Sequence, residues 1–448
     1  MVSTVIDSKV FGPLFSTDEM KKVFSDENLV QKWLDTEVAL AVSEAKLGII
    51  PQEAANEIQK KGKAELLDIA SIGEFYKSSI TIVPLLKAFK KILDNDAGEF
   101  VHWGATSQDI VDTGLILQIK EAHAIILDKV RRSEAAARKL AQKYRDTVMA
   151  GRTHVQHALP ITFGFKAAWW AAEFARHVER LKECEKRLFV GQFSGAVGTL
   201  ASLEKRGLEV QELMMKELGL HQPLIAWHSC RDHIAEFISI VALISSTVAK
   251  VSHEVLTLQR TEVAELEEPF FMGKVGSSTM PHKRNPQVCE NVIALTRNVR
   301  SIAPLAIEVM NCEHERDWGC EISEWEFVPR ACILADTALE KNLDIMENMI
   351  VYPEHMERNL NILKGLMLSE SVMMHLGEKL GRMSAHEIVY KSCMDAFEHD
   401  RPMLESMLAN PKVTEHFSKE EIQAMLDPKR YTGLAGEFVD RVLQTKPQ

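Results

Sequence analysis

The sequence predicts an all-α protein organised around very long helices. Between Pro84 and Pro160 there is no proline, a residue that breaks helix interiors. Within that gap, the run 109–149 repeats apolar residues at the three- and four-residue spacing of an amphipathic helix face. A second run, 233–266, has neither glycine nor proline over 34 residues. Short alternating segments occur, but they form no series of the kind that predicts a β-sheet.

Three helical domains follow from this pattern in chain order. Residues 1–104 are predicted to form a smaller N-terminal helical domain, and 351–448 a C-terminal one, in which Pro353 stands at the start of a new helix. Between them, 105–350 is predicted to be the central bundle domain. Its long helices are expected over the runs 109–149, 162–190, 233–266 and 288–311, the last kinked or broken at Pro304.

The long helices also predict self-association. The apolar residues of the run 233–266 cover more than one helix face, as in helices that are buried on several sides in a bundle or at a subunit interface. Helices this long and this apolar are not fully covered by a single bundle. We therefore expect a homo-oligomer.

Composition and charge exclude several functional classes. The chain has 448 residues, 46% of them hydrophobic and 26% charged, as in ordinary soluble globular proteins. Its formal net charge of -11 predicts no nucleic-acid partner, and an anionic substrate must meet a local cluster of positive groups. The seven cysteines form no C-x-x-C pair, which predicts free thiols rather than disulfides or structural zinc.

The same survey predicts a cytoplasmic protein without a membrane partner. The N-terminal residues show no basic stretch followed by an apolar run, so no secretory signal is predicted. The most apolar segment, 237–251, is expected to be too short and too interrupted by hydroxyl groups and Lys250 to span a bilayer.

Chemistry is expected where the long helices start and stop, and the first such place is 102–114, HWGATSQDIVDTG. Thr106 and Ser107 offer two hydroxyls at the start of a helix, where free backbone N–H groups and the helix dipole favour a carboxylate. Simple capping of the helix by either hydroxyl explains the same pattern. The segment alone leaves both interpretations open.

The second place is 151–164, GRTHVQHALPITFG. His154 follows Arg152 and Thr153 and precedes a long helix, and a loop histidine is able to exchange protons near neutral pH. A structural or surface histidine is the alternative. His157 is the weaker candidate of the two.

The third place is 273–286, GKVGSSTMPHKRNP, which is unusually long for a connection between bundle helices. Glycines loosen its backbone, and Ser277 and Ser278 add hydroxyls. Lys283 and Asn285 are able to bind an anion or a carbonyl, and Glu290 lies at the start of the next helix. An ordinary polar connection is the alternative, but the length and composition favour function.

The segment 276–286, GSSTMPHKRNP, resembles the G-S-S-x-M-P-x-K-x-N-P motif of the fumarase/aspartase superfamily. GATSQD and GRTHVQHALP resemble two further blocks of that superfamily in the same chain order, and FSGAVGTLASL (193–203) resembles a substrate-loop segment. The resemblance spans nearly the whole chain. It implies three α-helical domains, a homotetramer whose long helices form a twenty-helix core, and active sites assembled from three subunits.

The resemblance also implies roles for individual residues. Ser277 matches the base that removes a proton next to a carboxylate, and His154 with Glu290 matches a His–Glu couple that serves the leaving group. Carboxylate-binding positions are matched by Thr106, Ser107, Thr153, Lys283 and Asn285, and we add the neighbouring Arg152 and Ser278 as candidate substrate ligands. No metal and no organic cofactor is implied.

Within the superfamily, the sequence predicts a member that acts on a small polycarboxylate. Its first block, the segment EWEFVP and the C-terminal stretch most resemble the 3-carboxy-cis,cis-muconate cycloisomerases. Adenylosuccinate lyase is disfavoured, because that relative carries a histidine and an arginine near its N-terminus, whereas the first such residues here are His102 and Arg131. Trp325 also stands where that relative supplies another arginine.

Two alternatives to a cycloisomerase stay open. Many bacterial cycloisomerases carry tryptophan at the position of His154, whereas the lyases of the superfamily retain histidine. A C–N lyase that releases fumarate from an N-substituted aspartate or succinate, or an epimerase, is therefore the first alternative. A catalytically silent structural homologue is the second, and the intact set of candidate residues argues against it.

Overall fold

The computed structural model describes residues 4–75 and 81–447. Helices make up 67% of it and strands 4%, so the predicted all-α class is confirmed. The five long helices are α7 (Ser107–Lys143), α8 (Phe163–Leu188), α10 (Asp232–Leu258), α11 (Gln287–Glu308) and α12 (Trp318–Asn348). All seven cysteines, which lie within the described residues, are free thiols, as predicted.

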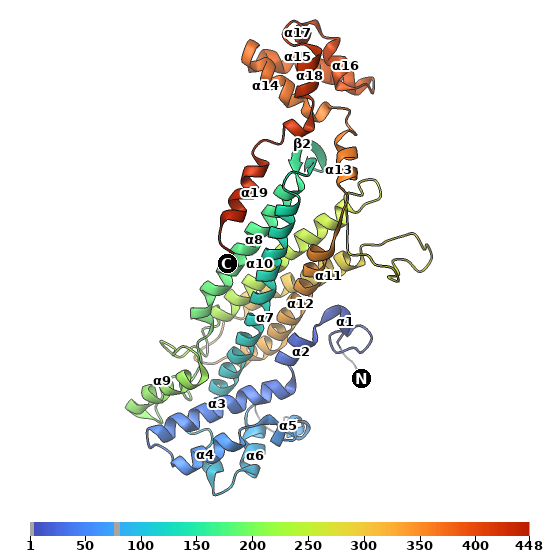
Figure 1. The fold of residues 1–448 in the computed structure, drawn as a ribbon. Coiled ribbons are helices and arrows are strands. Elements are labelled where there is room, and N and C mark those ends of the chain that lie inside the picture. The colour runs from blue at the N-terminus through green and yellow to red at the C-terminus, as the bar shows by residue number, and fades with distance from the viewer. Residues whose placement is uncertain (1–3, 76–80, 448) are drawn as a thin grey trace. The chain divides into compact units, whose positions relative to one another are not determined.

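Shorter helices lie before, between and after the long ones (Figure 1). Before α7 come α1 (Gly12–Phe15), α2 (Asp18–Val23), α3 (Asp26–Lys46), α4 (Gln52–Lys61), α5 (Ile69–Phe75) and α6 (Val83–Ile92), and between α8 and α10 lies α9 (Gly207–Leu218). After α12 come α13 (Pro353–Leu360), α14 (Ser369–Leu380), α15 (Arg382–Glu398), α16 (Met403–Leu408), α17 (Pro411–Thr414), α18 (Lys419–Met425) and α19 (Ala435–Gln444). Short 3-10 turns are η1 (Ala64–Leu66), η2 (Ala97–Phe100), η3 (Glu204–Arg206), η4 (Leu366–Leu368) and η5 (Pro428–Arg430).

The chain divides into two compact units, each built from three separate stretches. The first unit comprises Met1–Val130, His177–Ala249 and Asn291–Glu340, and the second comprises Arg131–Arg176, Lys250–Glu290 and Lys341–Gln448. The boundaries between the units fall inside long helices, whereas the predicted domains are continuous stretches of the chain. The two divisions therefore cannot be compared directly. The three predicted domains therefore stay a prediction.

Polar contacts between long helices run through the bundle of the first unit. His123 Nε2 on α7 lies 2.9 Å from the Leu181 carbonyl oxygen on α8, and His177 Nε2 on α8 lies 2.8 Å from Thr247 Oγ1 on α10. Lys129 on α7 forms a 2.7 Å ion pair with Asp336 on α12. Buried polar groups of this kind are costly unless paired, so they favour one register between the helices.

The N-terminal helices of the first unit form their own apolar core. Ser25 caps α3 by accepting a hydrogen bond from the Asn28 amide at 3.2 Å, and acidic residues occupy the first turn, where they favour the helix dipole. The buried side chains come from α3, α4, α6 and the start of α7, and include Trp33, Leu34, Ile58, Leu85, Phe89 and Ile110. This core supports the start of α7 from one side.

All the strands in the described part of the chain belong to the second unit. β1 (Val148–Thr153) pairs antiparallel with β2 (Gln156–Thr162), and β3 (Leu266–Glu267) pairs antiparallel with β4 (Ile350–Val351). The C-terminal helices pack separately around a core that includes Val372, Leu376, Met403, Met407 and Ile422. The sequence pattern predicts neither strand pair.

Two predicted helices end earlier than expected. The helix predicted over 109–149 ends at Lys143, before β1, and the one predicted over 233–266 ends at Leu258. After Leu258 the Glu265 amide donates back to the Leu258 carbonyl at 2.9 Å, and Ala264 adopts a positive φ of 53°. The chain therefore turns before it enters β3. By contrast, α11 continues through Pro304.

The prediction that the apolar segment 237–251 is too short to span a bilayer is wrong, because that segment is part of the longer helix α10. That helix has 27 residues, and by length and composition alone it is able to cross a membrane. It is the only such helix in the part of the chain that the structure describes, and 61% of its most apolar window is buried within the protein. A core helix of a bundle has the same properties.

Glu44 predicts a pH-dependent loss of stability. Its side chain is buried on α3, and neither carboxyl oxygen has a hydrogen-bond partner within the described chain. Burial, with Glu37 nearby, raises the pKa of the Glu44 carboxyl from 4.5 to about 9. The unfolded chain therefore releases this proton from about pH 4.5 upward while the folded chain retains it, which favours unfolding as the pH rises.

We expect Glu44→Gln to remove this pH dependence. The free energy of unfolding of the variant, relative to that of the wild type, should rise by at least about 1 kcal/mol between about pH 5 and pH 8. Urea denaturation at both pH values measures the difference, and other titrating groups cancel because both proteins share them. A relative stability that stays constant across this range would contradict the assigned burial of an uncharged carboxyl.

Candidate active site

The first candidate block lies where α7 begins in the first unit. The helix starts at Ser107, and Asp109 in its first turn accepts a hydrogen bond from the Thr106 amide at 3.0 Å. The Asp109 carboxylate therefore caps the helix. Both the Thr106 and Ser107 side chains are half-buried beside this carboxylate. Because Asp109 caps the start of the helix, that cap does not depend on either hydroxyl.

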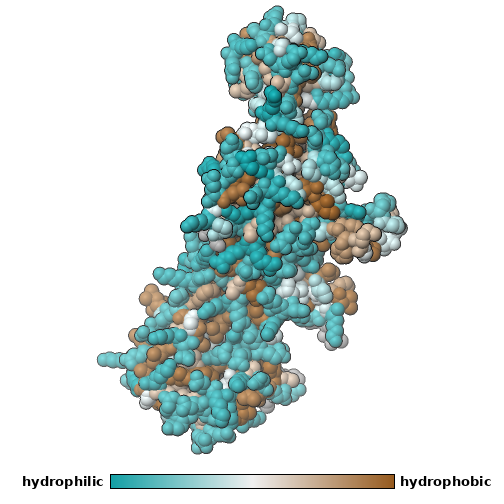
Figure 2. Space-filling view, viewed as in Figure 1, coloured by the Kyte–Doolittle hydropathy of each residue, from teal (hydrophilic) through white to brown (hydrophobic). Residues whose placement is uncertain are grey.

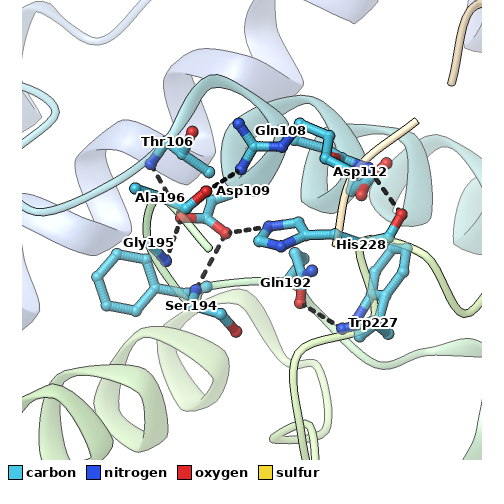
Figure 3. Close-up of polar contacts among 12 residues, drawn as sticks. Thr106, Gln108, Asp109, Asp112, Gln192, Ser194, Gly195, Ala196, Trp227 and His228 are labelled. Carbon is cyan, nitrogen blue, oxygen red and sulfur yellow. Dashed lines mark hydrogen bonds and ion pairs between the residues drawn. The ribbon is translucent and has the colours of Figure 1, made fainter. Parts of the chain in front are cut away.

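Asp109 also holds the 193–203 segment, and Figure 3 shows these contacts. Its fully buried carboxylate accepts from the Ser194 amide at 3.0 Å and from the Gly195 amide at 2.9 Å. His228 Nε2 lies 2.9 Å from Asp109 Oδ1. One side chain thus joins three segments that are far apart in sequence, and it places the two hydroxyls beside the loop that begins at Phe193.

Further contacts surround this junction. Gln108 donates to the His228 carbonyl at 3.0 Å, and the Trp227 indole donates to the Gly191 carbonyl at 3.0 Å. Arg316 donates to the Ala196 carbonyl at 2.9 Å. The segments around 192–196 and 227–228 are therefore held together with the start of α7 (Figure 3). Arg316 is attached to the first of these segments.

A buried ion-pair cluster lies behind the first block. Arg231 is 2% exposed and forms two hydrogen bonds of 2.9 Å with the Asp112 carboxylate and further bonds with Glu324. Nearby Glu321 is also buried, and its burial, with Asp112 adding to the effect, raises its pKa to about 8. The cluster links α7 to α12 and to the segment that precedes α10. It thereby holds the first turns of α7, which carry the first block, in place.

The second candidate block is the turn of the β1–β2 hairpin in the second unit. His154 and Val155 both have positive φ, 49° and 61°, as in a two-residue type I′ turn. A β-branched residue rarely adopts this conformation, so the turn holds local backbone strain. Thr153 and His154 are exposed at its tip, and Val155 is 88% exposed. The hairpin thus presents the candidate acid to the outside of the single chain.

Arg152 is committed to a structural ion pair. Its guanidinium forms a bidentate pair with buried Glu265, with N–O distances of 3.0 and 2.6 Å. Asn359 on α13 donates to the same carboxylate at 2.8 Å. Binding of a substrate carboxylate by Arg152 would leave Glu265 as a buried and unpaired charge, which is costly. The structure therefore favours a positioning role for Arg152.

The third candidate block is the long loop between β3 and α11, which we call the Ser277 loop (residues 269–286). The Ser277 hydroxyl oxygen accepts hydrogen bonds from the Thr279 amide at 3.3 Å and the Met280 amide at 3.1 Å. The loop thus directs two backbone donors at the oxygen that the resemblance identifies as the base. Such donors stabilise an oxyanion.

Other candidate residues of this loop differ in their contacts. Asn285 donates its side-chain amide to the Gly276 carbonyl at 2.8 Å, so in the single chain it stabilises the loop. Ser278 and Lys283 are exposed. A Cβ atom on Gly276 would lie 2.6 Å from the Lys283 carbonyl oxygen, so the chain passes too close to itself here for any larger residue.

Apolar side chains are exposed on the same loop. Phe271, Met272 and Val275 are 67%, 94% and 72% exposed, and Figure 2 shows hydrophobic colour on the loop that carries them. Exposed apolar groups gathered on one loop are typical of a surface that contacts another molecule.

A single chain does not pair His154 with Glu290. Both residues are exposed, and no hydrogen bond or ion pair joins them among the contacts of the described residues. Thr106 and Ser107 belong to the first unit, whereas the hairpin and the Ser277 loop belong to the second. The complete site, including the His–Glu couple, therefore stays a prediction that depends on the implied assembly from three subunits.

Three buried acids around β3, which the sequence motifs do not identify, organise the second unit: Glu265, Glu267 and Glu268. The acid-rich stretch ELEEP is their only signal in the sequence, and the helical pattern of 233–266 covers part of it. Among residues 4–75 and 81–447, no group of three or more His, Cys, Asp or Glu side chains is arranged to hold a metal ion.

Two family models and several known proteins match this chain. The family described as "Lyase" matches residues 15–301, and the one described as "Adenylosuccinate lyase C-terminus" matches residues 365–442. The chain is 43% identical to an N-acetyl-S-(2-succino)cysteine lyase from Enterococcus italicus, over 100% of this chain and 99% of that protein. It is 40% identical to an adenylosuccinate lyase from Methanocaldococcus jannaschii, over 96% of this chain and 94% of that protein.

A solved structure extends the likeness to three dimensions. The β-carboxy-cis,cis-muconate cycloisomerase from Acinetobacter calcoaceticus sp. ADP1 superposes with a TM-score of 0.91 at 35% identity. The match covers 97% of this chain and 100% of that chain. The all-α fold is therefore shared along the whole length.

Asp109 should control both stability and the first block. We expect Asp109→Asn to lower the free energy of unfolding by about 2–4 kcal/mol, because the buried amide directs an N–H group toward N–H donors. Chemical denaturation measures this loss, and Asp400→Asn, which changes a highly exposed carboxylate, is the control. A change in Asp109→Asn below about 0.5 kcal/mol, the usual range for surface positions, would contradict the role of Asp109 as a junction.

Proposed function

The chain belongs to the lyase family of the fumarase/aspartase superfamily, and we propose that it catalyses β-elimination from a substituted succinate, with release of fumarate. The observation that carries this proposal is the geometry at Ser277, whose oxygen accepts two backbone N–H groups. A serine oxygen acts as a base only where its negative charge is stabilised, and these donors, with Lys283 nearby in sequence, provide that stabilisation.

The proposed reaction breaks one C–H bond and one bond to the leaving group. Ser277 removes the proton from the carbon next to a carboxylate, and negative charge builds on that carboxylate. Lys283 and the hydroxyls of Thr106, Ser107 and Thr153 stabilise the charge. The electron pair then forms the carbon–carbon double bond of fumarate as the leaving group departs. His154, oriented by Glu290 of the assembled site, supplies a proton to a leaving group that does not depart as a stable anion.

We propose a thioether of succinate as the substrate class. Its support is the relative named N-acetyl-S-(2-succino)cysteine lyase, which covers the whole chain at 43% identity and whose named substrate carries a succino group on sulfur. The elimination alternative of the sequence analysis thus replaces the cycloisomerase as the leading hypothesis. The cycloisomerase stays the second candidate, because a solved cycloisomerase shares the fold at a TM-score of 0.91.

Three further proposals follow from family membership. We propose a homotetramer with active sites shared between subunits, a cytoplasmic location, and a reaction without a cofactor. Adenylosuccinate is a less favoured substrate, because the N-terminal region lacks the early histidine and arginine of that relative. A silent structural role is disfavoured by the donors arranged at Ser277.

A substrate panel tests the proposal. Purified protein is incubated with N-acetyl-S-(2-succino)cysteine, adenylosuccinate, argininosuccinate and 3-carboxy-cis,cis-muconate. Chromatography quantifies both the fumarate released and the consumption of each substrate. We expect fumarate from the thioether. Turnover of the carboxymuconate alone would establish the cycloisomerase instead.

Ser277→Ala provides the matched test of the base. We expect kcat to fall by at least about a hundredfold, the contribution of a positioned general base. The circular dichroism spectrum should stay unchanged, because Ser277 is half-buried on a loop and belongs to no helix. Ser278→Ala, which removes the neighbouring hydroxyl, should have the smaller effect. Near-normal turnover by Ser277→Ala would remove Ser277 from the mechanism.

The leaving group determines how much the reaction needs His154. A thiol has a pKa of about 8.5 and leaves as a thiolate, whereas an amine must be protonated before it departs. We therefore expect His154→Ala to lower kcat less than about tenfold with a thioether and at least about a hundredfold with an N-substituted aspartate. An equal loss with both substrates would contradict His154 as the acid.

A further inference from the structure

The Ser277 loop is fastened at both ends by two neighbouring buried acids, Glu267 and Glu268. Both acids belong to the second unit, as does the whole loop. They lie at and directly after β3, where the chain leaves the short sheet and enters the loop. Neither acid resembles a motif residue that was assigned a role above, and neither contacts Ser277.

Glu268 holds the entry of the loop. Its Oε1 lies 2.9 Å from Lys274 Nζ, and the same ammonium donates to the Pro269 carbonyl at 2.7 Å. Its Oε2 accepts from the Val288 amide at 2.9 Å and from the Cys289 amide at 3.0 Å, at the N-terminus of α11. One carboxylate therefore joins the first part of the loop to the helix that follows it. Both ends of the loop are held at a single point.

Glu267 holds the exit of the loop. Its carboxylate lies 3.1 and 3.3 Å from Arg284 Nη1, and its Oε2 accepts from the Tyr352 hydroxyl at 2.7 Å. The Arg284 guanidinium also lies over the ring of Phe270, 4.1 Å from its centre. The exit is thus attached to β3, to the segment after β4 and to the entry of the loop.

These contacts divide the loop into a fixed base and a short tip. The base consists of 269–274 and 284–286, and the tip consists of 275–283, which carries Ser277, Ser278 and Lys283. At the junction between them the Asn285 side chain bonds the Gly276 carbonyl, so the tip is also closed across its neck. Only nine residues remain for closure over a substrate, and ordering nine residues costs less entropy than ordering eighteen.

We propose that the Glu268–Lys274 pair is a clamp that positions the tip of the Ser277 loop for catalysis. Both residues are positioning residues: they act through the backbone that carries Ser277 and do not contact the substrate. The clamp holds the Ser277 oxygen in position, while the first block and the hairpin provide most of the contacts that bind the substrate carboxylates. The catalytic part of this inference, the effect of the clamp on kcat, rests on the proposed function. The mechanical part, the effect of the clamp on the mobility of the loop, does not.

Lys274→Met tests the clamp with the least disturbance. It removes the ammonium but leaves Glu268 bonded to the Val288 and Cys289 amides. Lys274→Arg is the rescue variant, because its guanidinium retains the charge and reaches the same carboxylate. Lys391→Met is the matched control, since Lys391 also pairs with a glutamate at 2.9 Å but at an exposed position on α15. None of the assigned substrate ligands is changed.

Hydrogen–deuterium exchange of the intact wild-type and variant proteins, without substrate, tests the mechanical part. We expect peptides within 269–286 to exchange at least about fivefold faster in Lys274→Met, as released loops do. Peptides of α11 after Glu290 should be unchanged. Lys274→Arg should restore the wild-type pattern, and Lys391→Met should not alter it. Unchanged exchange within 269–286 in Lys274→Met would overturn the clamp.

Steady-state kinetics with the substrate found in the panel tests the catalytic part. Lys274→Met should lower kcat by at least about tenfold, the effect of losing one charge-assisted hydrogen bond of ordinary strength. KM should change less than about threefold, and Lys274→Arg should recover most of kcat. A large rise in KM with normal kcat would make Lys274 a substrate ligand and would overturn the positioning role.

The two measurements separate the clamp from the proposed function. If the wild type eliminates fumarate from no substituted succinate, the proposed function fails, and the exchange experiment still decides whether the clamp exists. If fumarate is released and Lys274→Met retains wild-type kcat, the proposed function stands and the clamp does not contribute to catalysis.

Discussion

The irregular parts of this protein depend on buried carboxylates that are surrounded by donors. A carboxylate without partners in a protein interior is costly, so each buried acid must collect N–H groups or cations. In a helical protein most amides are already used, and the free ones lie at helix starts and in loops. Asp109 takes the amides of Thr106, Ser194 and Gly195. Each such acid therefore orders the segments that carry chemistry.

The same constraint explains the order of elements in the second unit. After α10 the chain places three acids close together, and each of them pairs with a cation. Glu265 pairs with Arg152, Glu267 with Arg284, and Glu268 with Lys274. The first cation belongs to the hairpin whose turn contains His154, and the other two belong to the Ser277 loop. A short stretch around β3 thus holds both candidate segments of this unit.

Periodicity predicted α7, α8, α10 and α11 because their apolar stripes repeat over many turns, but it placed the ends of α7 and α10 too late. It gave no range for α12. The acids at 265–268 continued an uninterrupted helical composition, and only the backbone turn after Leu258 excluded them from α10. The β1–β2 hairpin was missed for a related reason. Its strands contain Gly151 and Pro160, and its turn uses His154 and Val155 where glycine or asparagine is the usual signal. Tertiary contacts override local preference at both places.

The candidate site was predicted as a set of residues but not as a set of contacts. Hydroxyls, glycines and basic residues identified the three loops, because such residues are rare in the interior of a helical bundle. Their partners depend on folding: Arg152 is held by Glu265, and Asn285 by the Gly276 carbonyl. These two side chains satisfy donors and acceptors that no motif reveals.

Proton abstraction by serine imposes a last requirement, the exclusion of water. A serine oxyanion is stabilised by fixed dipoles only where bulk water does not compete with them. In the single chain, His154 and Lys283 are exposed, and so are the apolar residues of the Ser277 loop. The proposed elimination requires a further surface to cover the loop. In the proposed homotetramer, other copies of this chain supply that surface. Under this proposal, the apolar contact that covers the loop also excludes water from the Ser277 oxygen.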